Sequence, residues 1–314
     1  MRKLALQISP EVKGAYFSDY ISVAEAELKQ VFSGIEYEKV RHGALEFFIM
    51  DDTVDMEKLL RLSFAQGVYE VIDDKLLPRD CSASFYLHED FVFGSKYKGK
   101  TNERLTQLLL NIGLSMINTN DIGSVKLLDP MCGRGTTLLW GLRYGINGWG
   151  IELDKTALID IHRNLKKWTK IHRQKHQLKE GFIGETKKHA NKYLDFSIDS
   201  ITMRVINADT LQADSLFKKN KFDLIVSDLP YGVQHLAQLK SRNPFALLEE
   251  CAQVWKKCLK QHGAIVLAFN KNNPKREDLI HLFEKVGLVA NTFSAPHRMS
   301  ESIVRDVLVL KILE

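Results

Sequence analysis

Hydrophobic and polar positions alternate in one way over the first 73 residues of the chain and in another way after residue 100. In residues 1–73, short stretches with a period of two, typical of strands, are separated by two stretches that place apolar residues on one helical face. The predicted strands are LALQIS, VYEVI and a hairpin across YEKVRHGALEFFIM, and the predicted helices are SDYISVAEAELKQVF and DMEKLLRLSFAQ. This order predicts a small α+β domain of the ferredoxin-like kind over residues 1–73, without a glycine loop or an acidic cluster that suggests chemistry.

From Val125 onward, continuous apolar strands alternate with helices. The strands are VKLLD, GWGIEL, MRVIN, FDLIVS and AIVLAF, followed by a hairpin around LVANTF and IVRDVLVLKI. Such alternation predicts an α/β, Rossmann-like domain over residues 101–314, with a mostly parallel seven-stranded sheet covered by helices on both faces. A helix with Thr101 as its N-cap opens this domain. Ligands of such sheets bind beyond the carboxyl ends of the strands.

Residues 74–100 show neither period and are interpreted as a linker that packs on the next domain. The aromatic residues of this linker admit two interpretations, a lid or nucleic-acid contact on the one hand and burial beside a strand or two on the other. They are Tyr86, Phe91, Phe93 and Tyr97.

A basic segment, residues 166–192, interrupts the alternation before the third strand of the sheet. It is interpreted either as a solvated helical insertion or as an electrostatic patch for a phosphate backbone. Its histidines are His172, His176 and His189. Because these histidines lack acidic or thiol company, no metal site is predicted.

The composition is that of an ordinary globular protein, with 45% hydrophobic and 26% charged residues among 314. No apolar run approaches the roughly 20 residues that cross a bilayer, and no cleavage site follows the first residues, MRKLALQIS, so a cytoplasmic protein is expected. The net charge of +5 is compatible with a polyanionic partner. The cysteines form no CxxC pair and no zinc spacing, which predicts reduced, unpaired thiols at Cys81, Cys132, Cys251 and Cys258.

The first motif, LLDPMCGRGTT, is a predicted strand that opens into a tight glycine loop and a helix. Gly133 and Gly135 allow the backbone to approach a ligand closely, and the helix that begins near Thr136 points free N–H groups at it. The third glycine of a dinucleotide fingerprint and the GK[ST] of a P-loop are both missing. An acid at the end of the next strand is placed to accept both ribose hydroxyls of a nucleoside cofactor; Glu152 fits this position better than Asp154.

The second motif, FDLIVSDLPYG, is an apolar strand that ends in an acid, a proline and an aromatic residue. An amine conjugated to a ring or a carbonyl is a poor nucleophile because its lone pair is delocalised. The carboxylate of Asp228 and the carbonyl of Leu229 can each accept one N–H of such an amine, which holds the nitrogen near tetrahedral geometry and aims its lone pair at a methyl group. Pro230 stiffens the turn, and Tyr231 can stack on a base, worth about 1–3 kcal/mol. These four residues form the predicted catalytic set.

The loop DPMCGRGT resembles the D-P-x-C-G-x-G-T loop of class I S-adenosylmethionine-dependent methyltransferases, in the branch that methylates amino groups of nucleic acids. The resemblance implies S-adenosylmethionine as the cofactor. It places Asp129, Gly133 and Gly135 around the methionine part, Glu152 on the ribose, and Asp209 of INADTL on the adenine amino group. The implied cofactor site also includes Pro130, Cys132, Thr136 and Asp228.

The segment DLPYG resembles the [DNS]-P-P-[YFW] box of enzymes that methylate conjugated nitrogens. With leucine in place of the first proline and glycine after the tyrosine, it resembles the form found in RNA guanine-N2 methyltransferases associated with THUMP domains. The N-terminal pattern resembles the ferredoxin-like domain that precedes THUMP in that family. Between Ile72 and Thr101 there is no room for a THUMP core, so RNA binding would fall to the linker aromatics, the basic segment or a separate accessory subunit.

The leading hypothesis is therefore methylation of an exocyclic amine of RNA, with guanine N2 in tRNA or another structured RNA as the target. Two other enzymatic hypotheses, methylation of adenine N6 in DNA and of a glutamine amide in protein, rest on related boxes. DNA is less favoured because the chain has no visible target-recognition domain for it. Glutamine is less favoured because the enzymes that methylate it usually have the sequence N-P-P-Y in this box. A fourth hypothesis is a non-catalytic subunit that retains the fold and binds RNA or acts as a scaffold.

Overall fold

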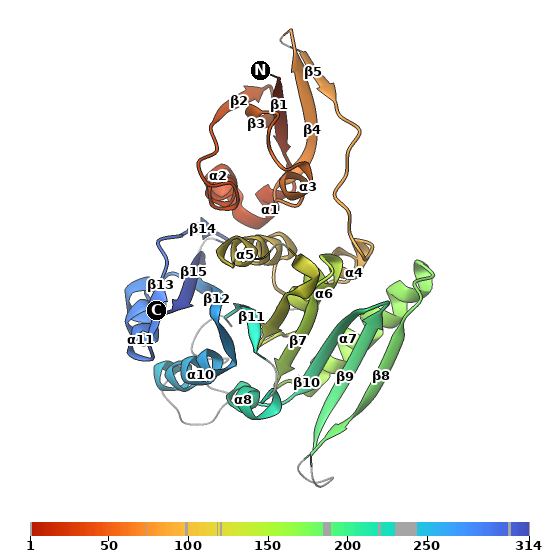
Figure 1. Ribbon diagram of the computed structural model, residues 1–314, viewed down its shortest axis with the longest axis vertical. Coiled ribbons are helices and arrows are strands. Elements are labelled where there is room, and N and C mark those ends of the chain that lie inside the picture. Colours follow the sequence, from red (N-terminus) through yellow and green to blue (C-terminus); the bar gives the residue numbers. More distant parts are fainter. Residues whose placement is uncertain are drawn as a thin grey trace.

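Two β-sheets with their helices lie one above the other in this protein (Figure 1). The computed structural model describes residues 2–73, 75–97, 100–117, 119, 121–184, 190–218, 221–229, 244–300 and 303–313. The upper unit holds β1 (Lys3–Ile8), α1 (Val12–Tyr16), α2 (Tyr20–Val31), β2 (Tyr37–His42), β3 (Leu45–Asp51), α3 (Met56–Leu60), β4 (Ala65–Ile72) and β5 (Lys75–Pro78), with a 3-10 turn at Phe17–Asp19.

The chain then crosses to the lower unit. Its helices are α4 (Asp90–Phe93), α5 (Glu103–Met116), α6 (Thr136–Arg143), α7 (Lys155–Ile171), α8 (Ala213–Leu216), α10 (Pro244–Cys258) and α11 (Arg276–Lys285), with 3-10 turns at Ile122–Ser124 and Thr210–Gln212. Its strands are β6 (Lys126–Asp129), β7 (Asn147–Glu152), β8 (Gln177–Ile183), β9 (Asn191–Ile198), β10 (Ile201–Asn207), β11 (Phe222–Asp228), β12 (Leu259–Asn270), β13 (Leu288–Ala290), β14 (His297–Arg298) and β15 (Val304–Ile312).

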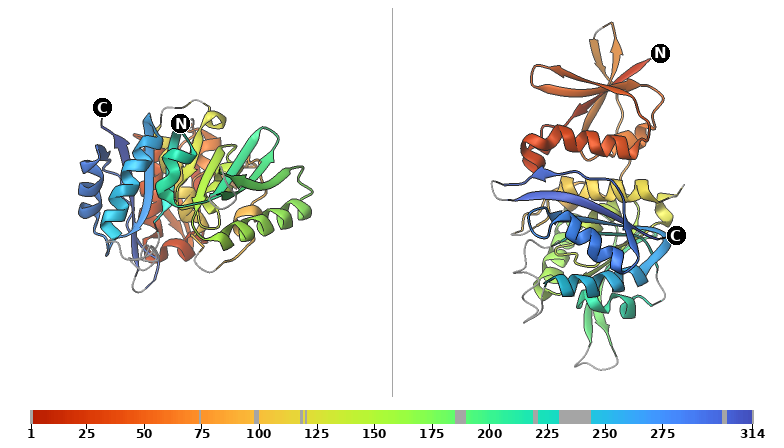
Figure 2. Two further views of the ribbon diagram at one scale, coloured as in Figure 1. Left: turned by 90° about the horizontal axis from the view of Figure 1, so that it is seen from below. Right: turned by 90° about the vertical axis from the view of Figure 1, so that its left-hand side faces the viewer.

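The upper sheet is antiparallel, in the order β2-β3-β1-β4-β5. Its first four strands have the ferredoxin-like order, and the fifth lies in the segment expected to be a linker. The helices α1, α2 and α3 lie on the face of this sheet that is turned toward the lower unit (Figures 1 and 2). The helix expected over residues 55–66 is shorter than predicted, because Ser63 bonds to buried Glu27 and the chain is already extended at Ala65.

The lower sheet has the order β13-β15-β12-β11-β6-β7-β10-β9-β8, and β14 pairs with β15 beside this path. Neighbouring strands from β10 to β12 are parallel, while β15 runs antiparallel to both β12 and β13. This arrangement confirms the predicted α/β, Rossmann-like fold. The expectation of seven strands was too low, because a hairpin extends one edge and β14 adds a short pairing at the other.

That hairpin is β8 and β9, and it projects beyond the rest of the sheet (Figure 1). The interpretation of residues 166–192 as a helical insertion was therefore wrong for most of its length. Helix α7 ends at Ile171 and the chain turns into β8 at Gln177. The exposed residues of β8 show no regular alternation, because both of its faces meet solvent over much of the strand.

Both faces of the lower sheet are covered, as predicted. Successive residues of a strand point to opposite faces, so Leu127 lies in the core beneath α5 and α6, and Leu128 lies in the core beneath α10 and α11. Helix α5 begins one residue later than expected, because Asn102, not Thr101, is its N-cap and accepts bonds from the N–H groups of Arg104 and Leu105. It lies between the two units (Figure 2).

Most of the four aromatic residues of the segment 74–100 pack against the rest of the protein. Phe91 is buried, the ring of Phe93 meets Trp140 edge-on at 5.7 Å, and the Tyr97 hydroxyl donates to the carbonyl of Asp160. Tyr86 alone among these four is largely exposed. The burial interpretation therefore holds fully for Phe91 and in part for Phe93 and Tyr97, and the first two lie in a helix rather than beside a strand.

The four cysteines are free, as predicted, and those of α10, Cys251 and Cys258, are buried. Within the described ranges, no helix has both the length and the apolar character that crossing a membrane requires.

A buried polar network joins the two units. Glu27 of α2 is fully buried and accepts bonds from the Ser63 N–H at 3.0 Å, from the Ser63 hydroxyl, and from the Asn111 amide of α5 at 2.6 Å. Burial raises the pKa of the Glu27 carboxyl, while the bonds from Asn111 and Ser63 act in the opposite direction. The network fixes the N-terminal unit against the helix that opens the lower unit.

Replacing Glu27 by alanine is expected to lower the free energy of unfolding by about 2–4 kcal/mol, because three buried donors lose their acceptor together. Urea unfolding followed by circular dichroism measures this loss. The exposed Glu36→Ala variant is the control and should stay within about 0.5 kcal/mol of the parent protein. Equal midpoints for the two variants would show that the network does not stabilise the fold.

Candidate active site at the carboxyl edge of the lower sheet

Four acidic residues lie at or just beyond the ends of four neighbouring strands, at one edge of the lower sheet. The strands β10, β7, β6 and β11 are adjacent and parallel, so their carboxyl ends lie side by side. Three spacings of about 4.8 Å separate the outer two strands, which gives the edge a length of about 14 Å. The acids, in this spatial order, are Asp209, Glu152, Asp129 and Asp228. The sheet thus gathers the acids of both sequence motifs.

The glycine loop between β6 and α6 has the backbone conformation that its residues predict. Gly133 and Gly135 have φ values of 51° and 79°, in the left-handed region that favours glycine. A Cβ built on Gly133 would meet no atom within 4 Å, so this part of the loop presents bare backbone to open space. The loop is anchored to β7 by the bond from the Cys132 N–H to the Ile151 carbonyl, at 2.9 Å. Such a turn can cradle a ligand.

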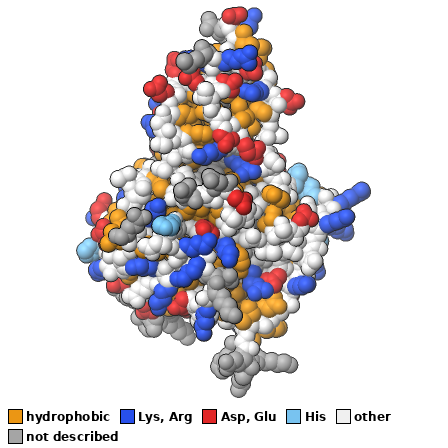
Figure 3. All heavy atoms as spheres, in the orientation of Figure 1, with side chains coloured by type: hydrophobic (Ala, Val, Ile, Leu, Met, Phe, Trp, Pro, Cys, Tyr) orange, Lys and Arg blue, Asp and Glu red, His pale blue; other side chains and the backbone are white. Residues whose placement is uncertain are grey.

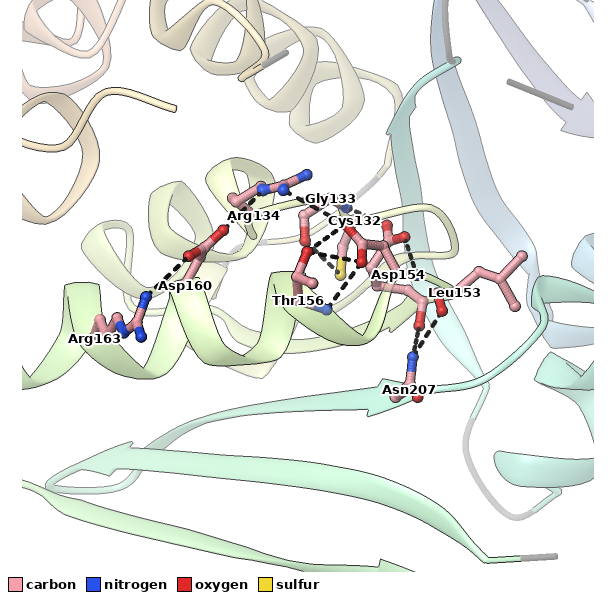
Figure 4. A network of polar contacts seen from close by, with 10 residues as sticks. Cys132, Gly133, Arg134, Leu153, Asp154, Thr156, Asp160, Arg163 and Asn207 are labelled. Atoms are coloured by element: carbon pink, nitrogen blue, oxygen red, sulfur yellow. Dashed lines mark hydrogen bonds and ion pairs between the residues drawn. The ribbon is translucent and has the colours of Figure 1, made fainter. Parts of the chain in front are cut away.

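Glu152 joins the end of β7 to this loop. One of its carboxylate oxygens accepts the Gly133 N–H and the other accepts the Asp154 N–H, both at 2.8 Å. Asp154 is engaged elsewhere: it caps α7 through the Thr156 N–H at 2.9 Å and lies 3.4 Å from the Arg134 guanidinium (Figure 4). A carboxylate oxygen has more than one lone pair, so Glu152 can still accept hydroxyl donors. Glu152 therefore lies against the glycine loop, whereas Asp154 is turned toward α7 and Arg134.

Asp129 links the two motifs physically. It is 2% exposed and accepts bonds from the Met131 N–H at 3.1 Å and from the Ser227 hydroxyl at 2.8 Å. Ser227 directly precedes Asp228, so this bond places the second motif against the first. Burial is the main cause that raises the pKa of Asp129 to about 6, and the nearby Glu152 carboxylate adds to the effect.

Asp209 lies just beyond β10 and accepts the Leu211 N–H at 2.9 Å. The neighbouring Asn207 donates its amide to the carbonyls of Glu152 and Leu153, at 2.8 and 2.9 Å, which ties the ends of β10 and β7 together (Figure 4). Leu153 is half exposed beside these acids and offers apolar surface to a ring. The sequence analysis missed both Asn207 and Leu153.

Three further residues of the expected cofactor site are buried supports of the loop. They are Pro130, Cys132 and Thr136. The Cys132 sulfur lies only 2.8 Å from the position that a Cβ on Gly150 would occupy. Any side chain at this point of β7 would therefore collide with the loop, and glycine avoids the collision. Burial raises the pKa of the Cys132 thiol well above its ordinary value, which leaves it uncharged. Thr136 is the first residue of α6, as expected.

Asp228 has a partner that the sequence analysis did not find. Its carboxylate meets the guanidinium of Arg305 from β15 in a two-pronged contact, with one N–O distance of 3.0 Å. Arg305 has no exposed surface, and burial lowers its pKa to about 9. One signal in the sequence could have indicated this partner: Arg305 and Asp306 are two charged residues inside the otherwise apolar run IVRDVLVLKI. The second of them, Asp306, pairs with Arg276. The pairing fixes the orientation of the Asp228 carboxylate.

The backbone after Asp228 is also anchored. The Leu229 N–H donates to the Ala268 carbonyl of β12 at 2.9 Å, and the Leu229 side chain is buried. The other two residues of the predicted catalytic set, Pro230 and Tyr231, lie outside the described residues.

Comparison with known proteins adds the family. A family model described as "RMKL-like, methyltransferase domain" matches residues 106–287, more than half of the chain. The chain belongs to this family. The RMKL-like protein is accordingly an S-adenosylmethionine-dependent methyltransferase of the RNA methylase type, as the glycine loop and the DLPYG segment suggested. No curated protein matches the chain.

Several solved structures share the general architecture at low identity. An S-adenosylmethionine-dependent methyltransferase from Clostridium acetobutylicum is 11% identical, with a TM-score of 0.43, over 72% of this chain and 96% of that one. An rRNA methylase from Streptococcus thermophilus is 9% identical, with a TM-score of 0.41, over 69% and 99%. The magnesium protoporphyrin IX methyltransferase of Synechocystis, solved with its cofactor bound, is 10% identical, with a TM-score of 0.43, over 68% and 86%. Likenesses this distant say nothing about the substrate.

The residues present fit this cofactor. A nucleoside that carries a sulfonium and an ammonium group needs bare backbone, hydroxyl acceptors and negative charge, and the edge offers all three. The bare backbone lies at Gly133, the Glu152 carboxylate can accept hydroxyl groups, and the acids without a cationic partner can supply the charge. Within the described ranges, Asp228 is the only one of these four acids that pairs with a cationic side chain.

Proposed function

We propose that this RMKL-like methyltransferase methylates an exocyclic amine of RNA, with guanine N2 in tRNA or another structured RNA as the target. The observation that carries the proposal is the bond from Ser227 to Asp129, because it joins the strand that bears Asp228 to the strand that opens the glycine loop. An amine bound at Asp228 would therefore lie beside a cofactor bound at Gly133.

In this proposal the cofactor is held along the acidic edge. Gly133 and Gly135 cradle its methionine part, with Asp129 near the positive charges. Glu152 accepts the ribose hydroxyls, and Asp209 accepts the adenine amino group. Pro130, Cys132, Thr136 and Asp228 complete the walls of the site. The cofactor supplies an electrophilic methyl group on a sulfonium, and the protein positions the two reactants.

Asp228 and Leu229 prepare the amine. The carboxylate of Asp228 and the carbonyl of Leu229 each accept one N–H, so the nitrogen becomes more tetrahedral and its lone pair points at the methyl group. Arg305 holds the carboxylate in place, and in this proposal Asp228 acts as an acceptor rather than as a base. The methylated nitrogen is acidic and loses its proton to water. Tyr231 is expected to stack on the base, which must be unpaired or flipped out of a helix.

RNA fits the surface of the protein. The chain has a net charge of +5, and Lys and Arg side chains gather where α7 passes into β8 and on the lower body of the face shown (Figure 3). Exposed Lys166, Lys167, Lys170 and Arg173 belong to that first group. A polyanion gains affinity at such surfaces by releasing counterions.

Transfer of a labelled methyl group to total RNA, DNA and protein tests the substrate class in one experiment. Label in RNA, with N2-methylguanosine lost from the RNA of cells that lack the protein, is the expected result. Label in DNA as N6-methyladenine, or in protein as methylglutamine, would instead support the enzymes with related boxes. Calorimetry with S-adenosylmethionine separates catalysis from scaffolding, because a scaffold without cofactor affinity would show no binding.

Affinity for S-adenosylmethionine is expected to rise as the pH passes about 6 and then to level off. Burial holds the pKa of Asp129 at about 6 in the free protein, so below this pH the carboxyl is neutral and attracts the cationic cofactor less. The same shift means that Asp129 favours the folded state most at low pH, and that this contribution is lost as the pH rises through 6. Calorimetry between pH 5 and 8 measures the affinity. The Asp129→Asn variant should lose the dependence, and an unchanged profile would show that Asp129 is not near the cofactor.

A further inference from the structure

A second cluster of ligating side chains lies away from the acidic edge. His88 and Asp90 come from the segment that enters α4, and His172 is the C-cap of α7. The Nε2 atom of His172 lies 2.9 Å from the Asp90 carboxylate, and the Nδ1 atom of His88 lies 3.3 Å from the same oxygen. The ligating atoms of all three residues lie within 4.8 Å of one another. Histidine side chains are visible on the surface near α4 in Figure 3.

No metal site was predicted from the sequence, because the histidines of residues 166–192 lacked acidic company. The fold supplies one. Asp90 stands 82 residues before His172 in the chain and meets it only because α4 packs beside α7.

We propose that His88, Asp90 and His172 bind a divalent transition-metal ion, with Zn²⁺ as the best fit. Two imidazole nitrogens and one carboxylate oxygen are a donor set typical of zinc, and they also suit cobalt and nickel. In a tetrahedral site with bonds of about 2.0–2.1 Å, neighbouring ligand atoms lie about 3.3 Å apart. The two measured distances to the Asp90 oxygen are close to this value. Water would take the fourth position.

The surroundings of His172 prepare it for this role. Its ring lies between aromatic neighbours, with ring centroids 5.9 Å from Trp168 and 6.3 Å from Phe91, which limits its orientation. It stands at the carboxyl end of a 17-residue helix, where the helix dipole favours positive charge. Within the described ranges, the ion pairs of Asp90 are both with histidines, so no lysine or arginine occupies the position of the metal.

His88 must move for the ion to bind. Its ring is stacked on that of His172 at 3.8 Å, and its Nδ1 accepts the Asp90 N–H at 3.2 Å. The side chain of His88 is 49% exposed, so its ring can shift off that of His172, with Nδ1 still beside the Asp90 carboxylate, without disturbing the core. The metal would thus tie the segment between the two units to the end of α7.

This site is independent of methyl transfer. Helix α7 starts beside the acidic edge, at Lys155, and its 17 residues place His172 about 25 Å from that end. The metal would stabilise the packing of α4 on α7, and it needs no role in the chemistry at Asp228.

Calorimetric titration of the chelator-treated full-length protein with ZnCl2 tests the proposal. We expect one ion per chain, with an affinity that falls at least tenfold in His88→Ala and in His172→Ala. His176→Ala is the matched control: this histidine lies four residues further on, is exposed, and bonds to the Gln174 carbonyl, so its loss should leave the affinity unchanged. Zinc should also raise the melting temperature of the parent protein and of His176→Ala but not of the other two variants.

Cobalt distinguishes this site from adventitious thiol binding. Co²⁺ bound by nitrogen and oxygen gives weak visible bands, whereas binding at Cys81, the only cysteine that is not buried, adds a strong sulfur charge-transfer band. Circular dichroism of His88→Ala, at a half-exposed position, shows whether the variant is folded. The proposal is overturned if the folded parent protein binds no zinc, or if His88→Ala and His172→Ala bind it as tightly as the parent does.

Discussion

Replacing Asp228 by asparagine is expected to lower the rate of methyl transfer by at least about 10²–10³-fold. The amide keeps the shape of the side chain but replaces one acceptor oxygen by a donor, so the amine loses the group that would orient its lone pair. Affinity for S-adenosylmethionine should change by no more than a few-fold, because Asp228 only borders the cofactor site in this proposal. Single-turnover kinetics with labelled cofactor measure the rate, and calorimetry measures the affinity.

Asp223→Asn is the matched control for this variant. Asp223 lies on the same strand, β11, but at its other end, where it accepts the Lys126 N–H and pairs with Lys260. Its replacement removes the same charge from the same strand and should leave the rate of transfer within a few-fold of that of the parent. If Asp228→Asn retains the full rate, Asp228 is not the acceptor of the amine and the proposed mechanism is wrong.

Replacing Arg305 by methionine is expected to lower the free energy of unfolding by about 3–5 kcal/mol. The guanidinium is fully buried and holds Asp228 through two contacts, so its loss leaves a carboxylate largely out of water without a partner. Methyl transfer should fall as well, because a carboxylate that takes up a proton or turns away no longer accepts the amine. Denaturant unfolding measures the stability, and the transfer assay measures the activity of the folded protein.

The double variant Arg305→Met with Asp228→Asn separates the two effects. Removing both charges of a buried pair is often nearly neutral, so most of the lost stability should return while the activity stays low. If the single variant Arg305→Met is as stable and as active as the parent protein, Arg305 has no positioning role. If the double variant is no more stable than the single one, the cost arises from packing and not from the charge.

The sequence by itself determined the local geometry of the acidic edge. The turn at Gly133 and Gly135, the helix from Thr136 and the acid at the end of β7 follow from short-range geometry, because glycine alone enters the left-handed region easily. The apolar strands were predicted for the same reason, since burial on both faces leaves continuous hydrophobic runs. Their carboxyl ends then meet at one edge in any parallel sheet. Local propensity and burial depend on residues that are close together in the sequence, so they can be predicted without knowledge of the fold.

Only the tertiary structure decided which distant groups pair. Arg305 and Asp228 are 77 residues apart, and their contact depends on β15 and β11 lying on either side of β12. The strand β8 was interpreted as helical because an edge strand with two solvated faces has little apolar alternation. Glu27 with Asn111, and His172 with Asp90, meet through packing between elements whose sequences carry no sign of one another. Such contacts arise from the packing of the whole chain, which fixes the partners of buried charges only after the sheets and helices have formed.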